Sequence, residues 1–105
     1  MAQFDVCQNR DANSRNATPY LLVVQSDLIA QLHTRAVVPL KPLAQQQDKT
    51  MKILTPLFDI QGETHVMVTP EIAGVSERIL GDRVISLAAR REEIMAALDL
   101  LLLGF

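Results

Sequence analysis

The sequence predicts one small domain that is mainly antiparallel β-sheet and ends in a single α-helix. Short apolar runs bounded by Pro, Gly, Asn and Asp occupy the chain as far as Ile85, which is typical of strands joined by turns. A helical spacing of apolar residues begins only after Ser86. A length of 105 residues suits one modest core. We therefore expect residues 1–105 to form one domain.

The first two predicted strands flank a long polar loop. Ala2–Cys7 alternates apolar and polar side chains, which is typical of a strand with one buried face. Residues 8–19 contain no Val, Leu, Ile, Met or aromatic side chain. We expect them to form a mobile surface loop without an anchor in the core. Tyr20–Gln25 is aromatic and β-branched, and is expected to be a buried strand.

The next strand is expected over Thr34–Leu40. Pro39 and Pro42 lack the N–H group that a central strand donates, so they are expected to end it. The polar stretch Gln45–Lys49 follows as surface chain.

A hairpin is predicted in the middle of the chain. Two apolar runs, Ile53–Ile60 and Thr64–Thr69, flank the short connection Gln61-Gly62-Glu63. After Pro70, a turn is expected over Glu71–Gly74. Ser76–Ile85 then holds one or two short strands, broken at Gly81-Asp82.

The last predicted element is a helix. Leu87, Ile94, Leu98 and Leu101 share one helical face. Ser86 is the expected N-cap, and Gly104 is expected to end the helix.

Composition excludes several classes of protein. The formal net charge is −2, whereas a domain that binds nucleic acid through its phosphates usually carries excess positive charge. The single Cys7 forms no internal disulfide or CxxC motif, and the N-terminal residues carry no visible secretory signal. The longest apolar stretch, Leu100–Leu103, is far shorter than the ~20 residues that span a bilayer. We expect a soluble, cytoplasmic protein.

The residues predict no catalytic site, metal site or cofactor. His33 and His65 have no ligand partner at helical spacing, and His65 is expected to face solvent or the edge of a pocket. Cys7 has no neighbouring base and is expected to pack beside the core. Glu92 and Glu93 diverge on a helix, so they cannot act as facing carboxylates.

The C-terminal run Leu100–Phe105 is apolar on every side of the last helical turn. A lone domain buries only one stripe of a helix. The excess apolar surface therefore packs either in the core and a homodimer interface, or against another protein with Phe105 as an anchor.

Together these residues resemble the CcdB family of gyrase-poisoning toxins. The resemblance rests on Val24-Gln25-Ser26-Asp27-Leu28-Ile29, on Thr34-Arg35-Ala36-Val37-Val38-Pro39-Leu40, on the hairpin in FDIQGETHVMVTPEIAGV, and on a C-terminal amphipathic helix that ends in Gly and one apolar residue. The order and spacing of these blocks carry the match over nearly the whole chain, apart from the loop at residues 8–19.

The resemblance implies an SH3-like barrel of the CcdB/MazF toxin type, shared with the Kid toxin and closed by the C-terminal helix. It implies a homodimer and a non-catalytic toxin of a type II toxin–antitoxin system. Such a toxin binds the DNA gyrase A subunit and traps the cleaved gyrase–DNA complex, and a CcdA-like antitoxin neutralises it. No direct sequence-specific contact with nucleic acid and no membrane contact are implied.

The family's gyrase contacts fall on two segments of this chain. The expected gyrase-binding residues are Ser26, Leu28, Ile29, Asp99, Leu102, Leu103, Gly104 and Phe105. The best-known toxin of the family ends in Trp-Gly-Ile, where this chain has Leu103-Gly104-Phe105, and it has Asn in place of Asp99. Leu103 cannot stack on an arginine as a Trp does.

Two alternatives stay open at this stage. One is a MazF-type endoribonuclease on the same fold, using Arg35 with His65 or Glu63 as cation and acid–base groups. The other is a non-toxic homologue that only dimerises and binds an antitoxin.

Overall fold

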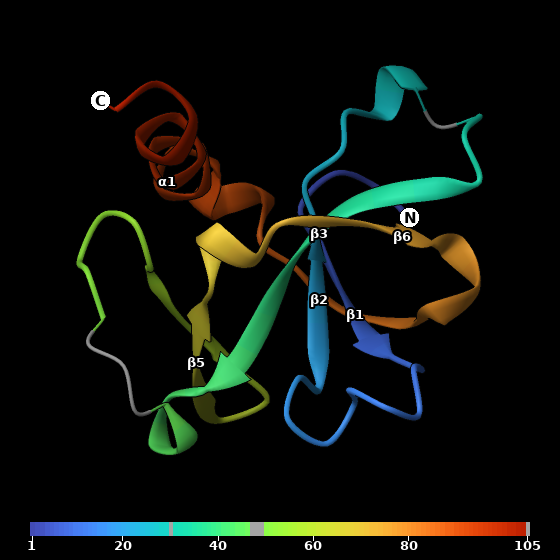
Figure 1. Cartoon of the computed structure of the whole chain (residues 1–105), viewed down its shortest axis with the longest axis horizontal. Coiled ribbons are helices and arrows are strands. Elements are labelled where there is room, and N and C mark those ends of the chain that lie inside the picture. The colour runs from blue at the N-terminus through green and yellow to red at the C-terminus, as the bar shows by residue number, and fades with distance from the viewer. Residues whose placement is uncertain (30, 47–49, 105) are drawn as a thin grey trace.

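The chain forms a curled antiparallel sheet with a C-terminal helix packed against it (Figure 1). The computed structural model describes residues 1–29, 31–46 and 50–104. The strands are β1 (Asp5–Asn9), β2 (Tyr20–Val23), β3 (Thr34–Pro42), β4 (Leu57–Ile60), β5 (Glu63–Met67), β6 (Ala73–Ser76) and β7 (Leu80–Ser86), and the helix is α1 (Arg91–Leu103). Short 3₁₀ turns lie between them: η1 (Asp27–Ile29), η2 (Leu43–Gln45), η3 (Thr69–Glu71), η4 (Glu77–Ile79) and η5 (Ala88–Arg90).

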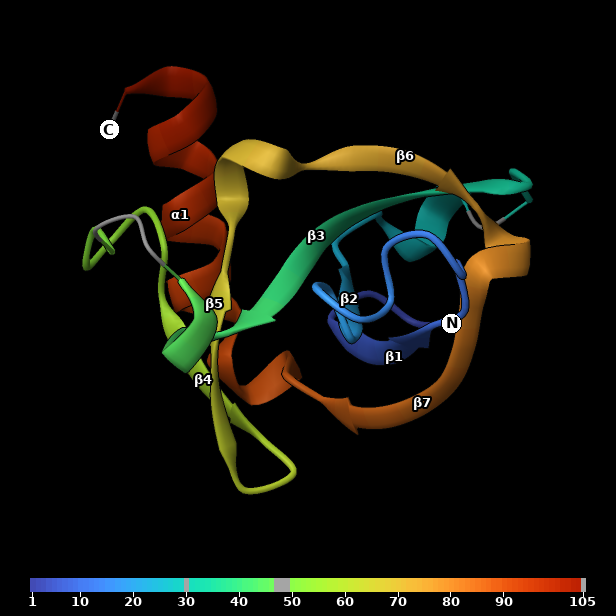
Figure 2. The same ribbon diagram turned by 60° about the horizontal axis from the view of Figure 1, so that its bottom comes forward.

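The strands form one seven-stranded sheet that branches at β3. Along one side, β3 pairs with β2. On its other side, Thr34–Val37 pairs with β6 and Leu40–Pro42 pairs with β5. The strands β6-β3-β2-β1-β7 make up the larger part of this sheet, called the larger sheet below, and β5 and β4 form a smaller branch from the other end of β3. Figure 2 shows β6 and β7 curling round β1 and β2, so the larger sheet is a half-barrel. This confirms the predicted mainly β class with a C-terminal helix.

The prediction that prolines end β3 is confirmed for Pro42, the last residue of the strand, and wrong for Pro39, which lies inside it. Pro39 O accepts a hydrogen bond from Val68 N at 2.9 Å. The nitrogen and the carbonyl of one strand residue face the same side, so the Pro39 nitrogen faces the point where β3 changes partner from β6 to β5. The missing N–H therefore costs no bond with β2.

The predicted hairpin is confirmed, with a tighter turn and a shorter first strand. Gln61 and Gly62 have φ angles of 55° and 82°, which is the pattern of a two-residue type I′ turn. Glu63 already pairs with Ile60 in the sheet. Residues 53–56 form turns rather than strand, because β4 begins at Leu57.

Further strand boundaries differ from the prediction: β2 ends at Val23 rather than Gln25, and β5 ends at Met67, so Thr69 lies in η3. β1 begins at Asp5 and continues to Asn9, and Ala73 and Gly74 belong to β6 rather than to a turn. β7 runs unbroken through Gly81-Asp82. A Cβ on Gly81 would lie 3.0 Å from the Cβ of Gln8, so this glycine allows β7 to approach β1 closely.

The helix begins later than predicted. The Ser86 hydroxyl accepts a hydrogen bond from Ala88 N at 3.2 Å, so it caps the turn η5, and α1 itself starts at Arg91. Gly104 ends the helix as predicted: its φ is 82°, and its N–H donates to Leu100 O at 3.1 Å.

The core divides into two clusters on opposite faces of the larger sheet. Alternate residues Leu22, Val38 and Leu40 pack beneath α1, against Ile94 and Leu98. The intervening residues, with members of β1 and β7, fill the inside of the curl: Cys7, Leu21, Val23, Val37 and Leu80. Burial on both faces explains why β2 and β3 are continuous apolar runs rather than alternating ones.

The loop after β1 is anchored, contrary to the prediction that nothing holds it. Asn9 is buried, and its side-chain amide donates to Ser14 Oγ at 3.0 Å and to Thr18 O at 2.9 Å. Its carbonyl oxygen accepts from Asp11 N at 3.0 Å. Thr18 is also buried. The sequence did not predict this anchoring, because the anchoring side chains are polar and the prediction relied on apolar residues.

His65 is also placed differently from the prediction that it faces solvent or a pocket edge. Its side chain is buried, with Nδ1 2.9 Å from Glu63 O and its ring edge-on to Tyr20 at 5.1 Å between centroids. Within the described part of the chain, Nε2 has no hydrogen-bond partner. A buried polar atom without a partner lowers stability by about 1–3 kcal/mol.

We expect Asn9→Ala to loosen the loop, because the substitution removes three hydrogen bonds of a buried side chain. The expected loss is about 1–3 kcal/mol of unfolding free energy, with faster tryptic cleavage after Arg10 and Arg15. Asn13→Ala is the matched control, because Asn13 is exposed. Equal cleavage rates for the two variants would contradict an anchoring role.

We expect His65→Phe to stabilise the fold by about 1 kcal/mol, because it removes the unpartnered Nε2 and keeps an aromatic ring against Tyr20. For a domain of this size, that change raises the melting temperature by about 4–8 °C. Thermal unfolding measures it, with exposed His33→Phe as the control. A fall in melting temperature would show that the imidazole contributes a favourable interaction.

Candidate partner-binding surface

The end of α1 exposes large apolar side chains. Ile94, Ala97 and Leu98 bury one face of the helix against the sheet. Leu102 and Leu103, one turn further on, are 71% and 62% exposed. Asp99 is exposed beside them. Because large apolar side chains are exposed together here, this helix end is a candidate surface for contact with another protein. No helix in the described residues is long and apolar enough to cross a membrane.

A second exposed apolar group lies on η1. Leu28 is 89% exposed and Ile29 47%. The turn that presents them is held by polar side chains. Ser26 Oγ accepts from Leu28 N at 3.1 Å, and Asp27 Oδ1 accepts from Gln3 N at 2.8 Å. Ser26, predicted as a contact residue, therefore also shapes the turn that holds Leu28 in solvent.

Buried Arg35 holds the chain at Leu32 and Thr34, after η1. Its guanidinium donates to the carbonyl of Leu32 and, at 3.0 Å, to that of Thr34. Its Nη2 lies 3.3 Å from Glu77 Oε2, and His33 Nδ1 lies 3.3 Å from Glu77 Oε1. The base of the segment is thus tied to η4.

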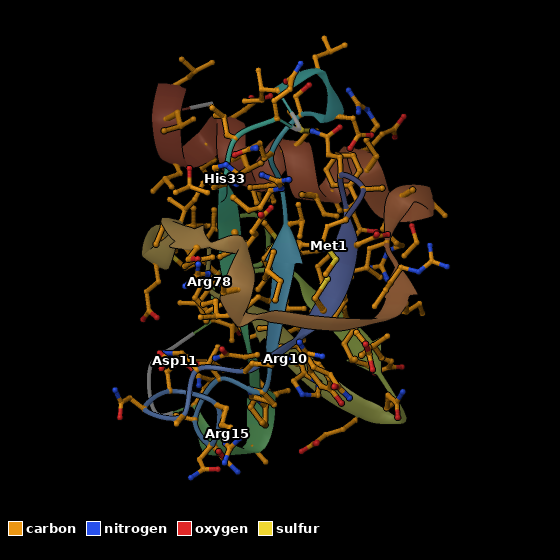
Figure 3. All side chains as sticks on the ribbon, turned by 90° about the vertical axis from the view of Figure 1, so that its right-hand side faces the viewer. Met1, Arg10, Asp11, Arg15, His33 and Arg78 are labelled. Carbon is orange, nitrogen blue, oxygen red and sulfur yellow. The ribbon has the colours of Figure 1, made fainter. Side chains whose placement is uncertain are left out.

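The predicted contact residues form two groups at one end of the molecule. Figures 1 and 3 both place η1 and α1 at the upper end, and Figure 1 shows them on opposite sides of it. Leu28 and Ile29 form one group, and Asp99, Leu102 and Leu103 form the other. Gly104 is the C-cap residue of α1. Phe105 lies outside the described residues.

Further exposed apolar residues were not predicted. Leu32 extends the η1 group, with 51% of its surface exposed. Met51 and Ile53, 56% and 59% exposed, lie in the turns before β4. Ile53 shares a surface hollow with Ala96 and Glu93 of α1.

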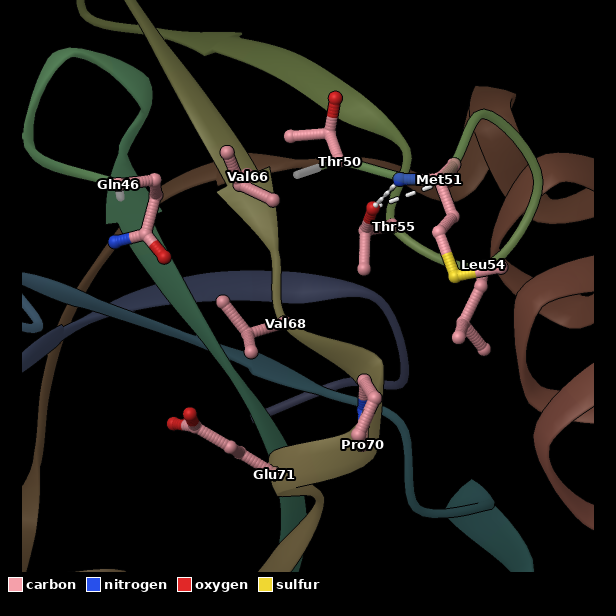
Figure 4. Close-up of a pocket in the computed structure, with 9 residues that line it drawn as sticks. All are labelled: Gln46, Thr50, Met51, Leu54, Thr55, Val66, Val68, Pro70 and Glu71. Atoms are coloured by element: carbon pink, nitrogen blue, oxygen red, sulfur yellow. Dashed lines mark hydrogen bonds between the residues drawn. The ribbon is translucent and has the colours of Figure 1, made fainter. Parts of the chain in front are cut away.

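A pocket of about 230 Å³ adjoins these turns (Figure 4). Met51 and Leu54 line it from the turns, Val66 and Val68 from β5 and the residue after it, and Pro70 from η3. Thr55 Oγ1 closes the turn by accepting from Met51 N at 2.7 Å. The carboxylate of Glu71 at its rim is paired with Lys41 Nζ at 2.9 Å. The lining is mainly apolar, so it suits contact with apolar groups.

The residues considered for ribonuclease chemistry do not meet. Arg35 and Pro42 lie at opposite ends of β3, and His65 pairs with Pro42. Seven residues of strand separate the two ends by about 23 Å. Glu63 lies beyond His65, farther still from Arg35. In the described part of the chain, no three His, Cys, Asp or Glu residues gather as a metal-binding group would.

Cys7 packs in the core, as predicted. It is buried in the inner cluster, with its thiol 3.3 Å from the Met1 sulfur. Burial raises the pKa of the Cys7 thiol, and the nearby Asp5 carboxylate raises it further. The thiol therefore stays protonated at neutral pH and is a poor nucleophile.

A curled half-barrel sheet with a helix on one face and apolar side chains exposed at one end defines a small β domain with a surface suited to protein contact. The sequence model of the CcdB protein family matches residues 3–104. The chain belongs to the CcdB family, and is thus a toxin of the toxin–antitoxin class.

We expect Cys7 to react with Ellman's reagent only after unfolding, because its thiol is buried and its pKa is raised. The measurement compares labelling at pH 8 in native buffer and in guanidinium chloride. Rapid labelling of the native protein would show that β1 opens locally.

Proposed function

We propose that this chain is a cytoplasmic toxin that binds the DNA gyrase A subunit and traps the cleaved gyrase–DNA complex, which blocks replication and transcription. Family membership supports the toxin class. The observation that carries the proposal is the exposure of Leu28, Leu102 and Leu103. These are positions at which the family resemblance expects gyrase contacts.

The energetics of these leucines favour binding. Each exposed leucine that becomes fully buried in the complex contributes about 1.5–3 kcal/mol to the free energy of binding. Asp27, Ser26 and Arg35 already order the η1 turn, so little conformational entropy is lost on binding. Asp99 adds a negative charge beside Leu102 and Leu103, which favours a cationic neighbour on the target.

The proposed neutralising partner is a CcdA-like antitoxin. Membership of a toxin family of toxin–antitoxin systems supports this partner.

We also propose that two copies associate along one flank of α1. On a helix, Leu100 and Ala96 lie on the flank that faces Ile53, whereas Leu102 lies on the opposite flank. Met51 and Ile53 extend the first flank with exposed apolar surface. A dimer that buries this flank leaves Leu102 and η1 available for the target.

A non-toxic homologue is the second candidate function, and one residue favours it. Leu103 stands where the best-known toxin of the family has Trp, and an aliphatic side chain cannot stack on an arginine. Such a protein would keep dimerisation and antitoxin binding and lose the trapping of gyrase.

We expect Leu102→Ser to weaken binding to the gyrase A subunit by at least about tenfold, because a buried leucine contributes more than the 1.4 kcal/mol that tenfold requires. Folding should change little, since Leu102 is 71% exposed. Ile85→Ser, at an exposed apolar position on β7 outside both proposed contact groups and the proposed dimer flank, is the matched control. Gyrase-dependent DNA cleavage and cell killing measure the function.

Leu103→Trp separates the two candidates. If this chain is a gyrase poison, the substitution should strengthen DNA trapping, because it restores the stacking contact. A chain with no gyrase binding before or after the substitution would be the non-toxic homologue.

For the Leu102→Ser variant, unchanged gyrase binding would show that the contact lies elsewhere and would contradict the proposed surface.

We expect Ile53→Glu to dissociate the dimer, because the buried flank would then contain an unpaired charge. Sedimentation at micromolar concentration should give a dimer for the parent chain and a monomer for this variant. Leu28→Glu is the control, since it places the same charge on exposed η1. A parent chain that sediments as a monomer would contradict the proposal.

A further inference from the structure

Strand β6 has an open outer edge. In its ladder with β3, Arg35 pairs with Val75 and Val37 with Ala73. Glu77 N donates to His33 O at 2.9 Å. Hydrogen-bonded pairs alternate along an antiparallel ladder. The N–H and C=O groups of Ala73 and Val75 therefore face β3, and those of Gly74 and Ser76 face outward.

Apart from its short length of four residues, this edge lacks the features that usually protect an exposed strand. Its residues are Ala, Gly, Val and Ser, with no charge, proline or bulge. A Cβ on Gly74 would meet nothing within 4 Å. By contrast, β4 carries exposed Asp59 on its strand, and β7 carries Asp82 and Arg83 and pairs with β1 through register shifts.

A hollow of about 430 Å³ lies beside β6 on the inner face of the curl. Ala73 and Val75 of β6 and Ile79 of η4 line one side, and the anchored loop from Asp11 to Thr18 lines the other. Its floor includes Leu21 and Val37. A strand added to β6 would direct every second side chain toward this largely apolar floor.

Exposed arginines flank the same place. Arg78 is the second residue after β6 and Arg15 lies on the loop; both are exposed, and among the described residues neither forms an ion pair. Arg10 reaches Asp82 only at 3.8 Å, between two exposed side chains. Figure 3 shows Arg78 near the ribbon of β6 and η4, with Arg10 and Arg15 below it. Of the carboxylates close by, Glu71 is paired with Lys41 and Glu77 with Arg35, while Asp11 accepts a hydrogen bond from Ser14 Oγ.

We propose that β6 binds an extended acidic segment of another protein by strand addition. Gly74 and Ser76 supply the main-chain hydrogen bonds, and the hollow beneath β6 takes apolar side chains at every second position of the segment. Arg78 and Arg15 pair with its carboxylates. This mode of recognition uses the backbone for affinity and the pockets for specificity. The site is separate from the end of α1, so it goes beyond the proposed gyrase contact and does not depend on it.

The probe is a capped synthetic peptide of about ten residues, a typical long strand, that alternates valine and glutamate. It is titrated into the ¹⁵N-labelled full chain. We expect the amide signals of Gly74 and Ser76 to shift and their hydrogen exchange to slow. A peptide that alternates valine and lysine should bind at least about tenfold more weakly.

Two protein variants test the edge itself. Gly74→Pro removes the outward N–H and keeps the ladder with β3, because proline is tolerated where the N–H faces solvent. Gly74→Ala keeps that N–H and is the matched control. We expect the proline variant to bind at least about tenfold more weakly than the alanine variant. Arg78→Glu should also weaken binding, and Arg78→Lys should restore it.

A third arm does not depend on the folding of any variant. The same valine–glutamate peptide, N-methylated at the residues that would face β6, cannot pair with the edge and should not bind. The proposal is overturned if this peptide binds like its parent, if the lysine peptide binds equally well, if the signal changes map to α1 or η1, or if no peptide binds at millimolar concentration.

Discussion

The rest of the structure depends on the division of hydrogen bonds along β3. One side of the strand pairs with β2, while the other side pairs first with β6 and then with β5. Pro39 lies near this change of partner, where its missing N–H removes no bond to β2. The split directs β5 and β4 into a smaller branch of the same sheet, while β6, β3, β2, β1 and β7 form its curled part (Figure 2). It thereby fixes the position of β6, whose outer edge has no neighbouring strand among the described residues.

Burial on both faces of β2 and β3 determines what remains on the surface. The outer face packs beneath α1, and the inner face fills the curl. Only one stripe of α1 finds room against the sheet, because the helix is short and the sheet beneath it narrow. The leucines beyond that stripe stay in solvent. The surface proposed for target binding is thus a direct consequence of how a small domain covers its own core.

Periodicity predicted the strands, the hairpin and the terminal helix well, because apolar burial dictates these patterns. Periodicity failed where hydrogen bonds and ion pairs between polar side chains determine the structure. The anchoring of Asn9, the burial of His65 and the tie between Arg35 and Glu77 depend on which side chains meet after folding. Pro39 was misjudged because a strand with two different partners on one side has no local signal. The exposure of Leu28 was expected only through family resemblance, since an apolar residue by itself predicts burial. Apolar surface in excess at Leu102 was indicated by the helical pattern, because residues Leu100–Phe105 are apolar on every side.

The two apolar groups at the upper end of the molecule differ in how firmly the fold holds them. The η1 turn is fixed at one end by Ser26 and Asp27 and at the other by Arg35, so Leu28 is presented by a rigid support. Leu102 and Leu103 lie in the last turn of α1, where the Gly104 N–H donates one hydrogen bond to the carbonyl of Leu100. A terminal turn opens more readily than an internal one. Binding at η1 therefore costs little conformational entropy, whereas binding at α1 also has to order the last turn of the helix. A partner that contacts both groups binds η1 first at a low entropy cost. The contact with α1 then adds more to the binding free energy, because the partner is already held next to the helix end when that end becomes ordered.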